Sequence, residues 1–337
     1  MESNRSNVNQ STIVQLDFSG TYVAITVVCL VMAAVIISLN GFVIFILARQ
    51  KDNNRLHFFI FQLAIADLCV GLVSVLCDGI FKGILRQKWY LGDVMCRIWH
   101  YSTFVVIIVS NNLLIGMSVD RYLAVRYPLR TITGEYRPYK AIIIGSWIMA
   151  LLIPVWTFPY IGAVLEGTSY YCHMEFTNEM GWQLYVTCTL LIVFFIPFLI
   201  VSVCYVGISV VVWNHWRQRR NLTEIIEMIT TLKASGHTAS NEGLLPKARI
   251  KTIKMTSIIC FSFFICWLPA TVFHILDVFD ISVLDPRFYL ILQRLYPLNS
   301  AFNPIIFLLF NKHLLPCWSP KSADKTYKSV RTTKTTV

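Results

Sequence analysis

The chain has 337 residues, of which 56% are hydrophobic and only 14% are charged. Soluble domains carry about 25% charged residues, so this composition excludes an ordinary water-soluble globular protein. The formal net charge is +11. We attribute this excess to one basic membrane side rather than to nucleic-acid binding, because retained Lys and Arg mark the cytoplasmic loops of membrane proteins.

Seven apolar runs are long enough to cross a bilayer, which takes about 20 residues for ~30 Å of hydrocarbon. The runs lack the period-two alternation of a membrane β-barrel. Inside lipid each backbone group must be satisfied within its own segment, so the sequence predicts an all-α bundle of seven membrane helices. The runs are 22–47, 58–80, 98–117, 141–164, 182–213, 253–278 and 288–310.

The charges between the runs predict the orientation of the bundle. Of the 29 Lys and Arg, 22 fall on one side, which we assign to the cytoplasm. This gives an extracellular tail at 1–21, the bundle at 22–311 and a cytoplasmic tail at 312–337. The first run follows no basic region typical of a signal peptide, so we expect it to act as its own anchor. Residues 222–232 have helical spacing and predict an extension of the fifth helix.

Both predicted tails contain modification or docking sequences. Asn4 and Asn9 begin outer sequons for glycosylation. Cys317 follows the last run and is a palmitoylation candidate, with a free thiol as the alternative. The Ser- and Thr-containing tail predicts phosphorylation. The C-terminal Val337 fits a PDZ ligand, although short C-terminal matches are frequent by accident.

Two cysteines are expected to pair on the outer side. Cys96 precedes the third run and Cys172 follows the fourth, so both face the oxidising compartment where disulfides persist. Cys77 is a nearby thiol that could compete. The bridge would hold the outer loop over the mouth of the bundle.

Polar side chains recur at mid-membrane depth, where ionisable groups cost at least ~2.5 to 3.5 kcal/mol on insertion scales. A carboxylate among amides and hydroxyls predicts a site for a small cation such as sodium, or for a shared proton. The alternative is a neutral network that joins the helices. The residues are Asn40, Asp67, Ser110, Asn111, Asn299, Ser300 and Asn303, with Asp67, Ser110, Asn299 and Asn303 as candidate sodium ligands.

These positions and their neighbours resemble the signature set of rhodopsin-like (class A) G-protein-coupled receptors. The resemblance spans all seven runs, one set of residues in each. It rests on Asn40; Leu63 to Asp67; Trp89 to Gly92 before Cys96; Asp120-Arg121-Tyr122; Trp147; Pro197 and Tyr205; Cys266-Trp267-Leu268-Pro269; and Asn299-Ser300 with Asn303-Pro304. The resemblance implies a multi-pass plasma-membrane receptor whose partners are a heterotrimeric G protein and arrestin.

Three stretches are similar to the vasopressin/oxytocin, neuropeptide S and crustacean cardioactive peptide receptors. They are 66–72, 273–279 and 287–304. The similarity implies a small peptide ligand.

The resemblance also assigns residues to activation. Asp120 would pair Arg121 until helix six moves outward, and Pro269 would supply the kink that lets it move. The activation residues are Asp120, Arg121, Tyr122, Trp267, Pro269, Asn303 and Pro304. Phe307 stands where the family has tyrosine, and the inner end of helix six has no acid to pair Arg121. We therefore expect altered activation with some ligand-independent activity.

The ligand should bind among helices two, three, five, six and seven. Thr103 stands where amine receptors have aspartate, which disfavours biogenic amines, and helix seven has no lysine for retinal. Outer acids favour a ligand with a cationic group, and aromatic rings offer further contacts. The candidate ligand residues are Asp277, Asp78, Thr103, Phe104, Glu175, Phe273 and Tyr296.

Other functional classes have weaker support in the sequence. A transporter or pump needs a chain of buried ionisable groups, and only Asp67 lies at mid-depth. An enzyme needs a nucleophile with its base or a metal site, and no such pattern occurs, so we expect neither catalysis nor a cofactor beyond sodium. A receptor for a non-peptide ligand and a decoy that does not signal remain the alternatives.

Overall fold

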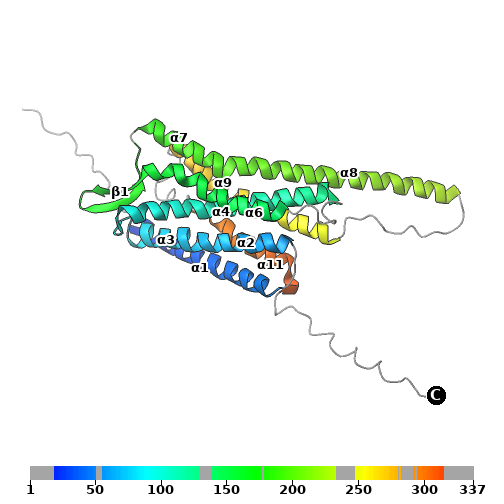
Figure 1. Ribbon diagram of the computed structural model, residues 1–337, viewed down its shortest axis with the longest axis horizontal. Coiled ribbons are helices and arrows are strands. Elements are labelled where there is room, and N and C mark those ends of the chain that lie inside the picture. Colours follow the sequence, from blue (N-terminus) through cyan, green and yellow to red (C-terminus); the bar gives the residue numbers. More distant parts are fainter. Residues whose placement is uncertain are drawn as a thin grey trace, which may run out of the picture.

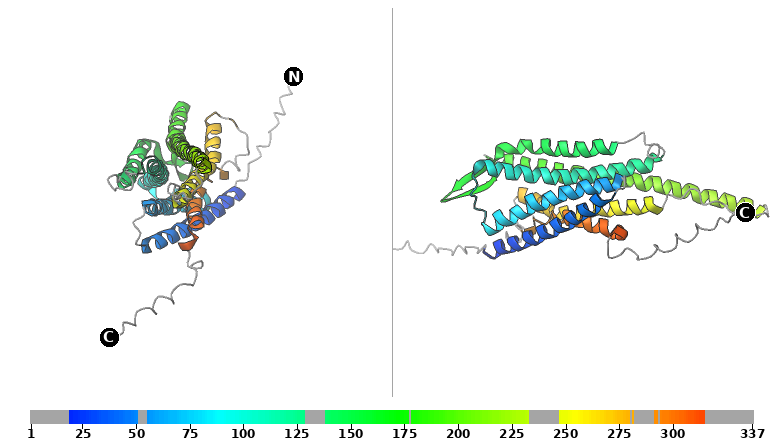
Figure 2. Two further views of the ribbon diagram at one scale, coloured as in Figure 1. Left: turned by 90° about the vertical axis from the view of Figure 1, so that its right-hand side faces the viewer. Right: turned by 60° about the horizontal axis from the view of Figure 1, so that its bottom comes forward.

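The computed structural model describes residues 19–50, 55–128, 138–176, 178–232, 247–279, 281, 291–292 and 294–314. Within these ranges only the backbone is described at 19, 138, 219, 222–232, 247–249, 277 and 313. The helices lie side by side in one elongated bundle, which carries a β-hairpin at one end (Figures 1 and 2). We call this end the hairpin end and the opposite one the Arg121 end.

The membrane helices follow the apolar runs, and several change helical type along their length. The first and third are single α-helices, α1 (Ser19–Arg49) and α4 (Gly92–Arg126). The second is built from α2 (Arg55–Cys69), a π-helix at Val70–Val75, α3 (Leu76–Asp78) and a π-helix at Gly79–Ile84. The fourth is α6 (Pro138–Leu152), followed by a 3-10 helix at Ile153–Tyr160.

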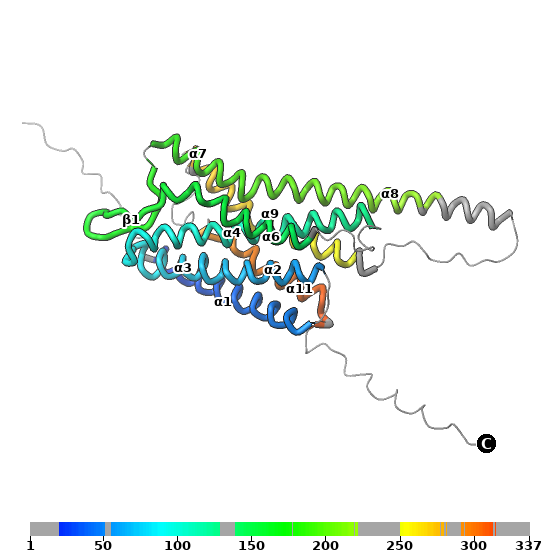
Figure 3. Tube along the Cα trace, viewed as in Figure 1, coloured from blue at the N-terminus to red at the C-terminus, as the bar shows by residue number. Residues whose placement is uncertain are grey.

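The second half of the bundle contains the longest helix. The fifth membrane helix consists of α7 (Glu179–Leu190), a π-helix at Leu191–Phe195 and α8 (Ile196–Leu232). The sixth is α9 (Lys247–Val278), and the described part of the seventh is α11 (Leu298–Phe310), which a short 3-10 helix at Lys312–Leu314 follows. The predicted helical extension at 222–232 is confirmed, and α8 runs past the other helices at the Arg121 end (Figures 1 and 3).

Six of these helices are long and apolar enough to span a membrane. The seventh predicted run is only partly covered, because 282–290 and 293 lie outside the described residues and Leu298–Phe310 is a shorter apolar helix. The chain is therefore a helical membrane protein with six full-length spans and a shorter seventh helix in its described part.

The fourth predicted span extends too far. We expected helix to Val164, but the α-helix ends at Leu152 and Ile161–Glu166 forms strand β1. Pro154 and Pro159 lack the backbone N–H that an α-helix needs at these positions. Strand β1 pairs antiparallel with β2 (Ser169–Met174), and Gly167 makes the turn with a φ of 62°, which favours glycine.

Helix α4 runs through the core of the bundle, where it packs against α2, α6, α8 and α9. Of the apolar part of α4, 67% is buried, a larger share than in any other described span. The core around it is aliphatic and aromatic, with Phe59, Leu113, Met117, Ile259 and Phe307 almost fully buried. The remaining helices expose large apolar side chains, as lipid-facing surfaces do.

Asparagines compensate for two of the prolines that interrupt the helices. Pro197 cannot donate to the carbonyl of Val193, and Asn111 Nδ2 donates to that oxygen at 3.1 Å instead. Pro304 likewise leaves the carbonyl of Ser300 without its helical donor, and Asn40 Nδ2 donates to it at 2.9 Å. Each bond ties a proline-containing helix to a neighbour at a point where lipid could not satisfy the backbone.

Candidate functional site

A cavity of about 270 Å³ opens inside the hairpin end of the bundle. Its walls come from the helices that the sequence predicted around a ligand, chiefly α4, α7 and α9. Helical spacing explains the lining, because Trp267, Ala270, Thr271 and His274 follow one face of α9. The lining residues are Lys82, His100, Thr103, Phe104, Ile107, Met174, Trp182, Tyr185, Val186, Thr189, Leu190, Val193, Trp267, Ala270, Thr271, His274 and Tyr296.

The predicted ligand residues divide between the cavity and its surroundings. Thr103, Phe104 and Tyr296 line it. Asp78, Glu175 and Phe273 are not among its lining residues, and the side chain of Asp277 lies outside the described residues. The polar residues His100, Lys82, Thr271 and His274 were not predicted to line the cavity, because their immediate neighbours in the sequence are apolar or aromatic. Counting one or two helical turns from Trp267 or Thr103 would have found most of them.

The floor of the cavity joins three helices. The rings of Trp267 and Tyr296 lie 4.9 Å apart between centroids, and Trp267 also contacts Phe263 at 6.0 Å on the side away from the hairpin. The hydroxyl groups of Tyr296 and Ser74 are hydrogen-bonded at 3.2 Å. A group that displaces Trp267 or Tyr296 therefore acts on α9, on the segment before α11 and on the second helix together.

The hairpin lies over the cavity, and a disulfide and contacts with Trp89 are among the interactions that hold it there. The predicted disulfide between Cys96 and Cys172 is confirmed, with the two Cα atoms 5.6 Å apart. The backbone N–H of Trp89 donates to the carbonyl of Tyr170 at 2.7 Å, and the indoles of Trp89 and Trp99 stack at 5.5 Å. These contacts place Met174, at the end of β2, in the cavity wall.

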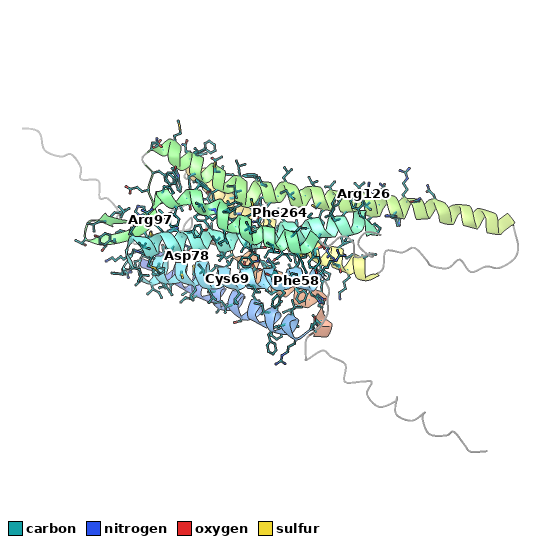
Figure 4. All side chains as sticks on the ribbon, viewed as in Figure 1. Phe58, Cys69, Asp78, Arg97, Arg126 and Phe264 are labelled. Carbon is teal, nitrogen blue, oxygen red and sulfur yellow. A yellow bond between two sulfur atoms is a disulfide. The ribbon has the colours of Figure 1, made fainter. Side chains whose placement is uncertain are left out.

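One ion pair lies beside the cavity. The ammonium of Lys82 lies 2.9 Å from a carboxylate oxygen of Asp78, four residues earlier in the second helix. Asp78 is buried, toward the hairpin end in Figure 4, and Lys82 reaches the cavity wall. Of the acids expected to attract a cationic ligand, Asp78 is thus already paired, and the side chain of Asp277 lies outside the described residues. Glu175 is exposed, and its backbone N–H bonds to the carbonyl of Tyr160.

The second candidate site is the buried carboxylate of Asp67, midway along the bundle. Ser110 and Ser300 donate their hydroxyls to Oδ1 at 2.7 and 2.8 Å, and Asn303 donates Nδ2 to Oδ2 at 2.8 Å. Asp67 therefore connects α2, α4 and α11. Among the described residues, Ser300 bonds this carboxylate and the predicted sodium ligand Asn299 does not.

The donors around Asp67 fit a small hard cation. A cavity of about 10 Å³ adjoins Ser110, Asn299 and Ser300, which is close to the volume that one water-sized sphere fills. The side-chain oxygens of Asn299 and Asn303 are buried without a hydrogen-bond partner. Oxygen atoms free to accept, next to a carboxylate, are the donor set that sodium prefers.

The third candidate site is at the Arg121 end, where α4 leaves the core. The guanidinium of Arg121 is paired with the neighbouring carboxylate of Asp120, as predicted. Arg55, at the start of α2, also lies 3.9 Å from that carboxylate, which is 2% exposed. The sequence has no acid on helix six to pair Arg121, and in the structure a second ion pair at this end comes from Arg55 on helix two.

Tyr122 completes this end of α4 by packing on α8. A Cβ atom at Gly207 would lie 2.6 Å from the Tyr122 ring, so only glycine allows this close approach. Close by, the thiol of Cys260 is 3.1 Å from the hydroxyl of Ser118 and 3.7 Å from the hydroxyl of Tyr205. These contacts tie α4, α8 and α9 together between the cavity and Arg121.

Phe307, which stands where the receptor family has tyrosine, is fully buried. Its ring meets that of His57 edge-on at 6.1 Å, so an aromatic contact with the second helix is kept where the family has a hydroxyl. Asn4, Asn9, Cys317 and Val337 lie outside the described residues, and their predicted modification and docking remain predictions.

Comparison with known proteins extends over most of the chain. Residues 39–307 match the family described as 7 transmembrane receptor (rhodopsin family). The neuropeptide S receptor of Macaca mulatta is 33% identical over 290 residues, which cover 85% of this chain and 76% of that receptor. The mesotocin receptor of Rhinella marina is 30% identical over 294 residues, which cover 87% of this chain and 75% of that receptor. The oxytocin receptor of Ovis aries is 30% identical over 279 residues, which cover 79% of this chain and 69% of that receptor.

Proposed function

The chain belongs to the rhodopsin family of seven-transmembrane receptors, and from this premise we propose that it binds an extracellular peptide and activates a heterotrimeric G protein. It is a multi-pass plasma-membrane protein. The resemblance to the oxytocin and neuropeptide S receptor group is confirmed, and those relatives are named for the peptides they receive. Their names support a peptide ligand for this chain.

One observation carries the proposal: the floor of the cavity and the paired Arg121 are connected through α9. Trp267 forms part of the floor, and seven residues further toward the Arg121 end Cys260 contacts Ser118 on α4 and Tyr205 on α8. Pro269 interrupts the helix directly above Trp267 and permits a change of bend there. A ligand that repacks Trp267 would thereby loosen the contacts that hold α9 against α4.

We assign the hairpin end to the outside of the cell. The Cys96–Cys172 bridge lies there, and disulfides persist in oxidising compartments. Most Lys and Arg fall on the side of the Arg121 end, which agrees with retention of positive charge in the cytoplasm. The place of the disulfide and the distribution of Lys and Arg in the sequence thus support the same orientation.

The proposal is tested by exposing cells that express the full chain to the peptides that name its relatives: neuropeptide S, oxytocin, mesotocin and isotocin. Calcium and cAMP are measured together, with surface expression measured on the same cells. A saturable response to at least one peptide is expected. Silence across the panel at normal surface expression would contradict the assignment and favour a non-peptide ligand. Binding without either response would favour a decoy.

Sodium bound at Asp67 is part of the proposal. Asp67, Ser110 and Asn303 would hold the ion, with oxygens of Ser300 and Asn299 close by. The ion would supply positive charge that keeps the buried carboxylate ionised. These residues bond one another across α2, α4 and α11. An ion held among them would therefore favour this resting arrangement of the three helices.

Arg55 is expected to limit ligand-independent signalling. The guanidinium of Arg55, on α2, lies near the carboxylate of Asp120. This carboxylate is therefore paired both with Arg55 and with Arg121. Arg55→Gln should raise basal signalling about two- to fivefold, because a partly exposed ion pair contributes up to ~0.5 to 1 kcal/mol. Basal second messenger is measured at matched surface expression, against cells without the receptor.

Arg49→Gln is the matched control for this change. Arg49 ends the neighbouring helix α1, and its guanidinium lies over the ring of Phe45 at 4.1 Å. This variant removes the same charge from the same membrane side and should leave basal signalling unchanged. Equal increases in both variants would attribute the effect to surface charge instead of the Arg55–Asp120 pair.

Three further partners are proposed from the sequence alone. Phosphorylation of the C-terminal Ser and Thr residues would recruit arrestin, and Val337 would engage a PDZ domain. Membrane lipid would meet the exposed apolar faces of the outer helices and the basic side at the Arg121 end.

A further inference from the structure

A groove of about 670 Å³ opens between α8 and α9 on the outside of the bundle. Most of its wall is apolar and faces outward, as at the exposed residues Val206 and Phe261. Two serines also line it, but the hydroxyls of Ser209 and Ser257 donate to carbonyls within their own helices. Since both helices are long and apolar enough to span the membrane, the groove is open to lipid, and its wall suits a hydrocarbon chain.

The groove spans the leaflet on the Arg121 side. On α8 its lining runs from Val201 to Val210, a rise of about 14 Å at 1.5 Å per residue. This is close to half of the ~30 Å of hydrocarbon in a bilayer. Phe264, in the wall on α9, lies near the middle of the bundle in Figure 4. Trp213 follows Val210 by three residues, and tryptophan is enriched where hydrocarbon meets the headgroups. The groove therefore reaches from the middle of the membrane to the headgroup level.

Aromatic and basic residues continue the groove-lining face of α8 toward its far end. Trp213 and Arg217 follow Val206 and Val210 at intervals of three or four residues, which places them on one face of the helix. The rings of Trp213 and Trp216 lie 5.3 Å apart, and both side chains are exposed. Arg217 is exposed as well and takes part in none of the ion pairs among the described side chains. Its charge is available to an anionic headgroup.

Helix α9 supplies two more basic residues at the same end of the groove. Lys254 and Lys251 precede the groove-lining Ile258 by four and seven residues, which places them on its face of α9. Both are exposed. The two helices run in opposite directions, so the basic ends of their groove-lining faces meet (Figure 1). Arg217, Lys251 and Lys254 form what we call the basic rim.

The basic rim has no acid at its own level of the two helices. Residues 201–221 of α8 and 247–264 of α9 contain neither Asp nor Glu. The first acids on α8, Glu224 and Glu227, follow Arg217 by seven and ten residues, which is about 10 and 15 Å along the helix. Retention of Lys and Arg in the cytoplasm explains the sign of the rim charges. It does not explain why they lie on the two faces that border the groove.

We propose that the groove holds an acyl chain of an anionic phospholipid whose headgroup is bound by the basic rim. Anionic lipids belong to the cytoplasmic leaflet, which lies at the Arg121 end in the proposed orientation. Cys260 lines the groove and its thiol contacts Ser118 on α4, so the chain would lie beside a contact that holds α9 in the bundle. The site is separate from the cavity at the hairpin end and does not depend on which ligand binds there.

The test uses the full chain, purified and reconstituted in phosphatidylcholine vesicles. Traces of phosphatidylserine or phosphatidylcholine are added, each with a photoreactive diazirine on the same acyl chain, and mass spectrometry of the digested receptor locates the label. The serine lipid should label 201–210 and 257–264 at least about tenfold more than the choline lipid, because each basic residue near the surface strengthens the attraction roughly fivefold. Other lipid-facing helices should be labelled equally by both.

Variants of the basic rim test the headgroup interaction. Arg217→Gln and Lys254→Gln should each lower the preference for phosphatidylserine in the groove about fivefold. Arg49→Gln and Lys140→Gln are the matched controls, because they remove the same charges from exposed positions at the Arg121 end of α1 and α6. Both controls should keep the preference. An equal loss in all four variants would attribute it to the overall surface charge and would overturn the proposed site.

A variant of the groove wall tests the acyl chain. Val206→Phe places a larger side chain in the groove and should reduce its labelling by both lipids severalfold. Val203→Phe is the matched control: Val203 lies on the same helix, is 64% exposed like Val206, and is not among the lining residues. Equal labelling of the two variants would mean that the chain does not occupy the groove.

Two further results would each overturn the inference. Equal labelling of the groove by the serine and choline lipids would reduce it to ordinary contact with bulk lipid. Labelling by a diazirine-bearing sterol, without labelling by phosphatidylserine, would make it a sterol site. Neither result touches the response to peptide, which is measured separately, so failure of this inference would leave the proposed function standing.

Discussion

Asp67→Ala is expected to abolish the peptide response and to destabilise the purified receptor by about 2 to 5 kcal/mol. Three interhelical hydrogen bonds end on the Asp67 carboxylate, and such bonds contribute ~0.6 to 1.7 kcal/mol each in membrane proteins. Alanine would leave the hydroxyls of Ser110 and Ser300 without acceptors in the core. Thermal unfolding in detergent measures the loss of stability, and second-messenger assays at matched surface expression measure the loss of the response.

The stability of the Asp67→Asn variant should lie between those of the wild type and of Asp67→Ala. Its amide oxygen still accepts from both serine hydroxyls, and Asn303 can present its own unpaired oxygen to the new N–H group. If sodium binds at this carboxylate, replacing sodium with a larger organic cation should shift wild-type basal signalling and leave the Asn variant unaffected. Ser262→Ala is the control, since its hydroxyl bonds only to the Ile259 carbonyl within its own helix. Equal stability of the alanine variant and this control would refute the account.

Cys172→Ser should lower peptide potency at least ~100-fold and reduce the amount of receptor at the cell surface. The disulfide closes a loop between positions 76 residues apart, which in the chain-entropy account corresponds to ~4 to 5 kcal/mol. Without it the hairpin keeps only noncovalent contacts, among them the backbone bonds to Trp89 and to the Asp93 carboxylate, and the wall residues His100 and Met174 lose their common anchor. Radioligand or fluorescent-peptide binding on intact cells measures the change.

Cys77→Ser provides the comparison for this prediction. Cys77 is a free, half-buried cysteine near the same end of the bundle, so its replacement tests loss of a thiol without loss of the bridge. We expect near-normal binding from this variant. Normal binding by the Cys172 variant as well would mean that the hairpin is positioned without the disulfide.

The sequence predicted most of the membrane helices because the bilayer imposes one simple requirement, a long apolar run with satisfied backbone bonds. The same criterion failed at Ile161–Glu166, where apolar residues pack in a hairpin instead of facing lipid. Hydropathy does not separate these environments. The nearby Pro154 and Pro159 were the available signal, and their effect on an α-helix could have been used to end the span at Leu152.

The sites were predictable to different degrees. The Asp120–Arg121 pair joins neighbours in sequence, and the cluster at Asp67 follows from the cost of a carboxylate in lipid. Ser300 was named among the buried polar residues but not as a partner of the carboxylate, because choosing between it and Asn299 requires the rotation of α11. Arg55 was counted only as a positive charge, since its approach to Asp120 depends on how α2 packs on α4.

The length of α8 turns a small motion at the cavity into a large one on the other side of the membrane. Leu190 and Val193, in the cavity wall, lie just before the proline from which α8 continues as one rigid rod to Leu232. From Pro197 to Leu232 this rod is about 53 Å long at 1.5 Å per residue. A tilt of about 5° at its base would swing the far end through roughly 5 Å, by the same helix geometry. The fifth helix can thus act as a lever arm, and a displacement of under about 1 Å around the ligand would suffice to move its far end, at Leu232.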